Sequence, residues 1–574
     1  MQSLIHLFRV GRFYGNCGPA NQVIDGLNRS LQTIHGENGG HTGDERSAGD
    51  NWLERPLIEP RWGSDRLEWS VPYYDALSLS MHDESPKPPT RPNHKSLSFK
   101  TKLAYGAGDA GAGITATLLA FSFLIFLTNV ANLRPALAGT VLLIGKIWDA
   151  VNDPIIGYLS DRTRSRWGRR HSWMLVASIP FGVFFFLYWI VPTFSEDPGL
   201  NQWARFIYYT IISIIFNAVS SAVTLPYTAL TPELSRDYDE RTSLTSYRFL
   251  FSIGGSILAL ALGQFFAMQF PDDSIAQYLS LGGVCAILSV LPIYWCVWGT
   301  TDPTAFNPRQ RAAGFGSDLD LRPSGSIWVQ FKDVLQSRPF WYVIGIYLCS
   351  WLSFQLTAAI IPYYAVSYME MDSYFSVALV VQGTAMLALV FWNWISYKYG
   401  RKRAYFAGMM GWIVAQILLF FLPSDRVDWL YILCALAGLG VSTAYLIPWS
   451  MLTDVTDLDE LNTGEQRQGT FYALMVFLQK TGLALGIWLA GIILELSGFV
   501  EPPPGEPIPP QPESALFAIR LVVGPLPALL LMVGLLLMYH YPITRELQET
   551  VILRLRERRE SLAQAKTPNR EIED

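Results

Sequence analysis

Charged residues are scarce in this chain. Only 16% of its 574 residues are Asp, Glu, Lys or Arg, whereas soluble domains carry about 25%. Half of the residues are hydrophobic, which argues against several soluble domains joined by polar linkers. The 43 basic and 48 acidic residues give a net charge of -5, which excludes a general nucleic-acid binder, since such proteins are usually basic.

Cysteine and histidine are also rare, with five and seven residues. Four of the cysteines fall in apolar runs without paired spacing, so neither a disulfide framework nor a zinc site is indicated. Five of the histidines precede residue 95, which leaves only His171 and His540 for the rest of the chain. Without a nucleophile, a base or a metal cluster, the sequence indicates neither an enzyme nor a bound cofactor.

Residues 1–98 differ from the remainder. They are polar, show no helical or alternating period and end in a Pro-rich run at residues 85–92, so we expect a disordered extension. Two interpretations stay open: a regulatory or partner-binding tail, or a segment that is not translated because synthesis begins at Met81. Residues 1–30 lack the apolar core of a secretory signal.

Apolar runs of about 20 residues recur after residue 98. This is the length of helix that crosses a bilayer core about 30 Å thick. Because an open strand or loop leaves backbone groups unpaired in lipid, these runs predict the helices of an all-α membrane protein. Twelve are found, near residues 104–130, 136–160, 172–192, 203–231, 247–270, 277–299, 340–368, 373–396, 404–422, 429–455, 468–498 and 514–541.

The loops between these spans alternate in charge. Basic residues gather after the second, sixth and eighth spans, as in Arg162, Arg309 and Arg401, and the loops of the other parity carry few. Because Lys and Arg accumulate on the cytoplasmic side, we predict a multi-pass protein of the plasma (inner) membrane with both termini in the cytoplasm.

Two motifs recur at the same place in each half of the chain. Leu225-Pro-Tyr-Thr-Ala-Leu-Thr-Pro-Glu matches Ile447-Pro-Trp-Ser-Met-Leu-Thr-Asp-Val, and Ser160-Asp-Arg with Gly168-Arg-Arg matches Ser396-Tyr-Lys-Tyr-Gly-Arg-Lys-Arg. Such repeats are typical of secondary transporters, whose substrate site lies between the halves. We predict six-helix halves at residues 99–299 and 340–541, an interdomain loop at 300–339 and a tail at 542–574.

The second span contains three ionisable side chains, although each costs about 2.5 to 3.5 kcal/mol at the centre of a membrane helix. Lys146, Asp149 and Asp153 are spaced by three and four residues and therefore share one helical face. Two carboxylates so close repel each other, and they either share a proton or recruit a cation. Together with Asn152 and a hydroxyl from another helix, they are predicted to bind Na+ or H+.

Other spans contain further candidates. Lys480 in the eleventh is expected to face the interior and pair with a carboxylate of the second span, and Arg248 begins the fifth. Asp109 in the first span either lines the pathway or caps a close-packed helix. Tyr227 and Trp449 follow the Pro of the repeated motif, where they are candidates to stack a sugar ring or pack an acyl chain. For each charged group, a structural ion pair is the alternative.

The string Ile147-Trp-Asp-Ala-Val-Asn-Asp-Pro-Ile-Ile-Gly-Tyr, followed by Thr163-Arg-Ser-Arg-Trp-Gly-Arg-Arg, resembles the signature of the glycoside-pentoside-hexuronide:cation symporters. This resemblance extends over about residues 99 to 541. It implies the major facilitator fold with twelve helices, alternating access and cation-coupled symport. Carried over by position, it implies that the cation ligands are Asp149, Asn152, Asp153 and Ser221, and that Arg248 and Lys480 are functionally important basic residues. We expect these two, together with Lys146, to act in coupling or gating.

The resemblance is incomplete where members of that family hold a sugar, because their carboxylates in spans one and four align with Gly113 and Thr224. We predict a symporter, coupled to Na+ or H+, for a glycoside or related sugar. A sodium-coupled lysophospholipid or other amphiphile transporter is the alternative, since that group has similar span-two and span-four motifs, and a non-transporting sensor is a second alternative. The predicted pocket comprises Asp109, Gly113, Thr224, Tyr227, Trp449 and Lys480.

Overall fold

The computed structural model describes residues 97–565, apart from 164, 166, 236–237, 301–326, 466 and 503–508, together with two short strands. The chain divides into two units, Met1–Pro92 and Asn93–Asp574. In the first unit, β1 (Arg61–Trp62) pairs antiparallel with β2 (Leu67–Glu68). The prediction of a disordered extension at residues 1–98 did not include this pairing. The remainder of residues 1–96 lies outside the described residues. The structure therefore does not decide whether this segment is a regulatory or partner-binding tail or is not translated.

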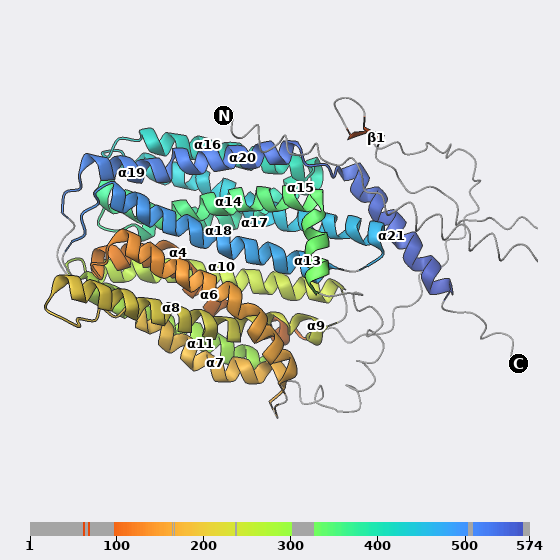
Figure 1. Ribbon diagram of the computed structural model, residues 1–574, viewed down its shortest axis with the longest axis horizontal. Helices are drawn as coiled ribbons and strands as arrows, with labels where there is room; N and C mark the ends of the chain where they lie inside the picture. The colour runs from red at the N-terminus through yellow and green to blue at the C-terminus, as the bar shows by residue number, and fades with distance from the viewer. Residues whose placement is uncertain are drawn as a thin grey trace, which may run out of the picture. The chain divides into compact units, whose positions relative to one another are not determined.

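The described part of the second unit is helical (Figure 1). Its first half contains α3 (Phe99–Ala107), α4 (Ala110–Phe121), α5 (Phe123–Ile125), the π-helical turn η2 (Phe126–Val130), α6 (Pro135–Arg162), α7 (Arg169–Leu187), α8 (Pro198–Thr228), α9 (Thr231–Leu234), α10 (Tyr238–Gln269) and α11 (Ser274–Thr300). Its second half contains α14 (Arg338–Tyr363), the π-helical turn η5 (Tyr364–Tyr368), α15 (Phe375–Tyr399), α16 (Arg401–Phe421), α17 (Val427–Thr463), α18 (Gln468–Leu496), α19 (Glu513–Val523) and α20 (Pro525–Tyr539). Helix α13 (Ile327–Gln336) lies between the halves in sequence, and α21 (Arg545–Ala565) follows them.

Most of these helices are suited to cross a membrane. Among the described residues, ten are long and apolar enough, and the pair Phe99–Phe121 and Phe123–Val130, bent by 51°, makes an eleventh span. Helix α6 has 28 residues, about 42 Å at 1.5 Å per residue, but its ionisable side chains make it polar for a span. With α6, the described part contains twelve spans in the predicted order, and the predicted all-α, multi-pass membrane fold is confirmed.

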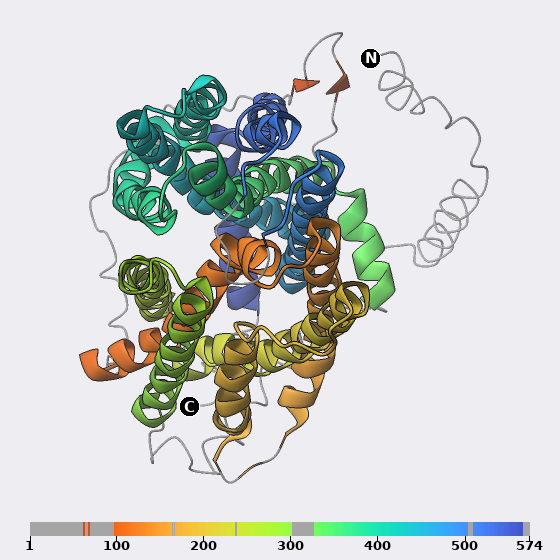
Figure 2. The same cartoon turned by 90° about the vertical axis from the view of Figure 1, so that its left-hand side faces the viewer.

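The two halves form two bundles. In Figure 1, α3 to α11, coloured orange to yellow-green, lie below α14 to α20, coloured green to blue, and Figure 2 shows the same bundles from one end. Helices α6 and α18 pack along each other at the boundary, as α10 and α15 do. Of the residues expected to face the substrate, Lys480 on α18 therefore lies on a helix that packs against both bundles.

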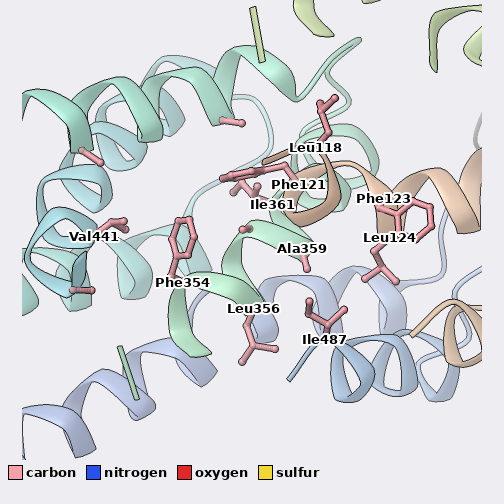
Figure 3. Close-up of a cluster of buried hydrophobic side chains, with 14 of the residues drawn as sticks. Leu118, Phe121, Phe123, Leu124, Phe354, Leu356, Ala359, Ile361, Val441 and Ile487 are labelled. Carbon is pink, nitrogen blue, oxygen red and sulfur yellow. The ribbon is translucent and has the colours of Figure 1, made fainter. Parts of the chain in front are cut away.

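Part of the hydrophobic core lies between the bundles. Figure 3 shows Leu118 and Phe121 of the first span beside Phe354 and Ile361 of α14. The rings of Phe121 and Phe354 meet edge to face with their centroids 6.2 Å apart, and both side chains are buried. Between helices that span a membrane, close van der Waals packing drives association, so these contacts stabilise the association of the halves.

The two ends of the bundle differ in charge and in contacts. We call the end with the loops after α6 and α15 the basic end, and the end with residues 131–134, 270–273, 369–374 and 497–502 the opposite end. Several hydrogen bonds join the halves at the opposite end. They are Thr128 to Tyr363 (2.7 Å), Tyr278 to Tyr374 (3.1 Å), Ser373 to Gln264 (3.0 Å), Asn132 to the carbonyl of Pro502 (2.7 Å) and the amide of Ala136 to Glu495 (2.8 Å).

The segment 300–339 was predicted to be an interdomain loop. Its described part contains helix α13, and Asp333 on this helix forms an ion pair with Arg467, which precedes α18, at 3.1 Å. Val334 of the same helix is buried. The connection between the halves is therefore attached to the second half at the basic end.

Candidate cation and substrate site

Helix α6 presents its polar face to the interior of the bundle. It begins at Pro135, which suits the first turn of a helix because that turn leaves its backbone amides without intrahelical partners. Pro154 lies inside the helix and has no amide hydrogen, so the carbonyl of Ala150 loses its intrahelical donor. This carbonyl lies in the same turn as Asp149 and Asp153, and the sequence therefore places an additional oxygen near the two carboxylates.

The two carboxylates of α6 share one ammonium group from the other half. The Nζ atom of Lys480 on α18 lies 2.9 Å from Asp149 Oδ2 and 2.5 Å from Asp153 Oδ2. Asp149 is buried, and the side chains of Asp153 and Lys480 are only 20% and 23% exposed. The predicted pairing of Lys480 with a carboxylate of the second span is thus present, and it involves both carboxylates.

A hydroxyl from a third helix completes this arrangement. Ser221 on α8 is buried, and its Oγ lies 3.1 Å from Asp149 Oδ1 and 2.6 Å from Asp153 Oδ1. A hydroxyl has one hydrogen, so Ser221 donates to one carboxylate at a time and can turn its lone pairs toward a cation. Asn152 is also buried, and its amide nitrogen has no hydrogen-bond partner among the described residues.

The charges of this cluster balance. Lys146 lies 3.6 Å from Asp149 Oδ2 and donates to Asn217 Oδ1 at 3.3 Å, so two ammonium groups face two carboxylates. A further cation would meet no net negative charge while Lys480 stays in place. Burying an unpaired charge is costly, and breaking a buried pair by removing one partner costs about 3 to 5 kcal/mol. The arrangement therefore suits exchange of Lys480 for another cation.

A second charged cluster lies within the first half. Asp109 occupies the N-cap position of α4, where the first span is interrupted, and Arg248 on α10 lies 3.6 Å from it. The guanidinium group of Arg248 stacks over the ring of Tyr227 at 5.1 Å, and its Nε has no partner among the described residues. The Tyr227 hydroxyl donates to the carbonyl of Tyr105 at 2.8 Å. Asp109 thus lies at the end of a helix, as in the prediction that it caps a close-packed helix, and it also forms an ion pair with Arg248.

Gly113 lies at a close helix contact, and Tyr227 and Trp449 lie in different surroundings. A Cβ atom on Gly113 would collide with the backbone carbonyl of Ser252 on α10, so glycine at this position permits close helix packing. Thr224 is half-buried, and no hydrogen bond ties its side chain in the described part. Tyr227 is buried against Tyr105, whereas Trp449 is half-buried in the second half. The two matching places of the repeat therefore have different surroundings.

Trp449 belongs to an aromatic cluster of the second half that the sequence did not identify. Its ring stacks on Tyr472 at 5.9 Å, and it meets Tyr347 edge to face at 5.7 Å. Trp351 packs against Tyr445 at 5.2 Å, and its indole nitrogen is buried without a partner among the described residues.

Two glutamines accompany this cluster. Gln355 on α14 and Gln382 on α15 are buried, and each has a side-chain oxygen without a partner among the described residues. Unpaired polar groups within an aromatic wall can bind a ligand that supplies hydroxyls or amides. The signal was available in the sequence, since each glutamine interrupts an apolar span.

Comparisons with known proteins agree with this architecture. Residues 104–545 match the family described as MFS/sugar transport protein. The chain is 46% identical over 532 residues to an uncharacterized symporter of Synechocystis sp., covering 81% of this chain and 98% of that protein. It is 28% identical over 537 residues to the sodium-dependent lysophosphatidylcholine symporter 1-B of Danio rerio, covering 87% and 96%. A crystal structure of a D-xylose-proton symporter has a similar fold, with a TM-score of 0.54 at 16% identity over 78% of this chain and 98% of that chain.

Proposed function

The chain belongs to the MFS/sugar transport protein family, and from this membership we propose that it is a secondary symporter that couples its substrate to a cation and works by alternating access. Both relatives reported above are symporters, in agreement with the prediction of a transporter rather than an enzyme. The second span resembles the signature of the glycoside-pentoside-hexuronide:cation symporters, and we propose that the chain shares the cation site of that subgroup but not its substrate. The observation that carries the proposal is the double ion pair of Lys480 with Asp149 and Asp153.

The proposed cycle begins with exchange at this ion pair. A cation enters between Asp149 and Asp153, takes oxygens from Ser221 and the rotated amide of Asn152, and releases Lys480. Because Lys480 lies on α18 and the carboxylates lie on α6, the release removes an electrostatic contact between the halves. The halves then rock about the substrate, and the substrate must in turn tighten cation binding by the same factor, since coupling is reciprocal.

Na+ is the coupling ion that we favour over H+. Ser221 and Asn152 are neutral oxygen donors, which contribute ligands to a metal cation but are not needed to hold a proton. The relative from Danio rerio is named as sodium-dependent. A sensor without transport would not need the charge-balanced cluster of Lys480, Asp149 and Asp153, so we place transport ahead of that alternative.

For the substrate, we propose an amphiphile with a phosphate-containing headgroup, of the lysophospholipid class. Gly113 is enclosed by Ser252, and Thr224 carries no charge, so the first half lacks the acidic clamp that a galactoside would use. Arg248 instead offers a guanidinium group with an unpartnered Nε, and guanidinium is well suited to phosphate. The relative from Danio rerio is named for lysophosphatidylcholine.

A glycoside is the second candidate, and the aromatic cluster of the second half favours it. Trp351 and Trp449 provide faces on which a sugar ring can stack. The unpartnered oxygens of Gln355 and Gln382 provide acceptors for its hydroxyls. These groups lie in the half that carries none of the proposed cation ligands.

Uptake by the full-length protein in proteoliposomes tests these proposals. Lysophosphatidylcholine and a series of methyl glycosides are supplied with an inward Na+ gradient, a proton gradient or neither. Accumulation that requires Na+ supports Na+ symport, and the substrate that accumulates decides between the two classes. The variant Asp153→Asn should lose cation-dependent uptake yet keep its helical circular dichroism, whereas Asp425→Asn, exposed at the opposite end, should behave as the unmodified protein. Retained coupling in Asp153→Asn would refute the cation site.

We further propose that the basic end faces the cytoplasm of the inner membrane, with both termini on that side, because basic residues collect in its loops. Reporter fusions at the two termini and after residue 196 test this topology. A cytoplasmic signal at both termini and an external one at residue 196 is the expected result.

A further inference from the structure

The matching basic loops of the two halves have different partners. In the first half, Arg169 pairs with Glu233 at 2.5 Å, and Arg170 pairs with both Asp161 and Glu233. Two carboxylates thus accompany the two arginines that begin α7. Glu233 lies 3.3 Å from Arg170 as well, so the group forms a connected network.

In the second half, this compensation is incomplete. Arg401, which matches Arg169, pairs with Asp454. Lys402, which matches Arg170, donates to the backbone carbonyl of Tyr539 at 2.7 Å. The place of Asp161 in the repeat is taken by Tyr397, which is 85% exposed. At the matched positions, the second loop therefore has the same cations and one carboxylate fewer.

The uncompensated cations surround a cavity of about 780 Å³ between the α15–α16 loop, α17 and the start of α21. Its basic lining residues are Lys398, Arg401, Lys402, Arg403 and Arg545, and its acidic ones are Asp454 and Glu549. Both carboxylates are already engaged, since Asp454 pairs with Arg401 and Glu549 pairs with Arg545 at 3.0 Å. Three positive charges remain in excess.

Exposed aromatic rings surround the same cations. The ammonium group of Lys398 lies 5.2 Å from the ring centroids of both Trp394 and Tyr399, and that of Lys402 lies 5.6 Å from the centroid of Tyr539. Trp394 and Tyr539 are 55% and 67% exposed. Aromatic and basic residues at the ends of membrane helices lie at the level of the lipid headgroups, so the cavity is expected to open toward that layer.

We propose that this cavity binds the phosphate headgroup of an anionic phospholipid from the leaflet at the basic end. Basic pockets between helices at a membrane surface are suited to such headgroups, and the charge excess disfavours a zwitterionic lipid because its choline or amine is repelled. Arg545 of the cavity belongs to α21, and the neighbouring Gln548 bonds to Asp457 of α17 at 3.2 Å. A bound headgroup therefore joins α16, α17 and α21 and fixes the C-terminal helix against the second half.

Lipid binding to the full-length protein tests the site without any transport measurement. The double variant Lys398→Gln/Arg403→Gln removes two of the excess cations and leaves the pair of Arg401 with Asp454 intact. The control Lys100→Gln/Arg162→Gln removes the same charge from exposed positions at the basic end of the first half. Native mass spectrometry counts retained lipid, and the melting temperature is followed with short-chain phosphatidylglycerol, short-chain phosphatidylcholine or inorganic phosphate at constant ionic strength.

Phosphatidylglycerol should remain bound and raise the melting temperature of the protein, and phosphatidylcholine should not. A basic side chain near an anionic headgroup contributes about fivefold in affinity, so the double variant should weaken binding about 25-fold and the control should not change it. Equal loss of binding in the control would overturn the assignment to this cavity. Stabilisation by inorganic phosphate that phosphatidylglycerol does not exceed would overturn the lipid as the source of the phosphate.

Discussion

Lys480 of α18 and Asp153 of α6 form an ion pair of 2.5 Å across the boundary of the two halves, although 327 positions separate them in the chain. The same ammonium lies 2.9 Å from Asp149. One side chain thus links the second half to the two carboxylates that are proposed to bind the coupling cation. In the proposed cycle, its release and return link ion binding to movement of the halves.

Replacing Lys480 with Met should make the stability of the protein depend on Na+. The substitution leaves Asp149 and Asp153 with Lys146 as their nearest cation, so the folded state loses about 3 to 5 kcal/mol without Na+. Na+ should then bind about tenfold more tightly, because it no longer competes with an ammonium group, and coupled uptake should be lost. A Na+ titration of the melting temperature measures the effect. Lys480→Arg keeps the charge and serves as the control, and an unchanged Na+ affinity in Lys480→Met would contradict the exchange mechanism.

Ser221→Ala should weaken Na+ binding about tenfold, because a hydrogen bond or ligand interaction with a charged group contributes about 1.5 to 3 kcal/mol. Ser221→Thr keeps the hydroxyl and should remain close to the unmodified protein. The measurement is the Na+ concentration that gives half-maximal uptake. If alanine and threonine behaved alike, Ser221 would be a packing residue and not a ligand.

The hydrogen bonds at the opposite end should hold the halves together there. Tyr363→Phe removes the bond to Thr128, and Glu495→Gln weakens the cap on the first turn of α6. Loss of the neutral Tyr363 bond contributes about 1 kcal/mol, and Glu495→Gln keeps an acceptor and only weakens its bond, so the double variant should shift the open-to-closed ratio at this end by at least about fivefold. Spin labels at residues 196 and 425, one in each half, should report a longer distance by electron resonance. Asp272→Asn, at the same end, is the control, and an unaltered distance distribution would show that other contacts close this end.

Gln382→Ala should weaken substrate binding about tenfold and leave the Na+ affinity of the substrate-free protein unchanged. The side-chain oxygen of Gln382 is buried without a partner among the described residues, so its proposed role is in ligand binding. Isothermal titration with the transported substrate measures the effect, and Trp429→Phe, at an exposed position, is the control. A change in Na+ affinity without substrate would instead indicate a structural role for Gln382.

The parts of the site that follow from local geometry could be predicted from the sequence. Asp149 and Asp153 lie one turn apart on a helix, so their proximity requires no knowledge of tertiary structure. The need to pair Lys480 follows from the cost of a charge in a membrane helix. The twelve apolar runs likewise predict their helices, because a single physical requirement of the bilayer sets their length.

The parts that depend on which helices meet could not be predicted. Arg248 and Asp109 are 139 positions apart, and nothing in either span indicates that they pair with each other. Gly113 aligns with a binding position of other transporters, yet the approach of α10 at Ser252 encloses it. Helix packing decides both cases, and a single sequence contains no direct record of it.

The aromatic cluster of the second half has a practical consequence for protein engineering. Since α14, α15 and α17 carry Trp351, Gln382 and Trp449, while α6 and α8 carry the proposed cation ligands, selection for a new cargo that binds the aromatic cluster can be confined to the second half. A mutant library restricted to these three helices would leave the energy source of the transporter intact. Its members could then be compared at a constant ion gradient, so that differences in accumulation report recognition of the cargo.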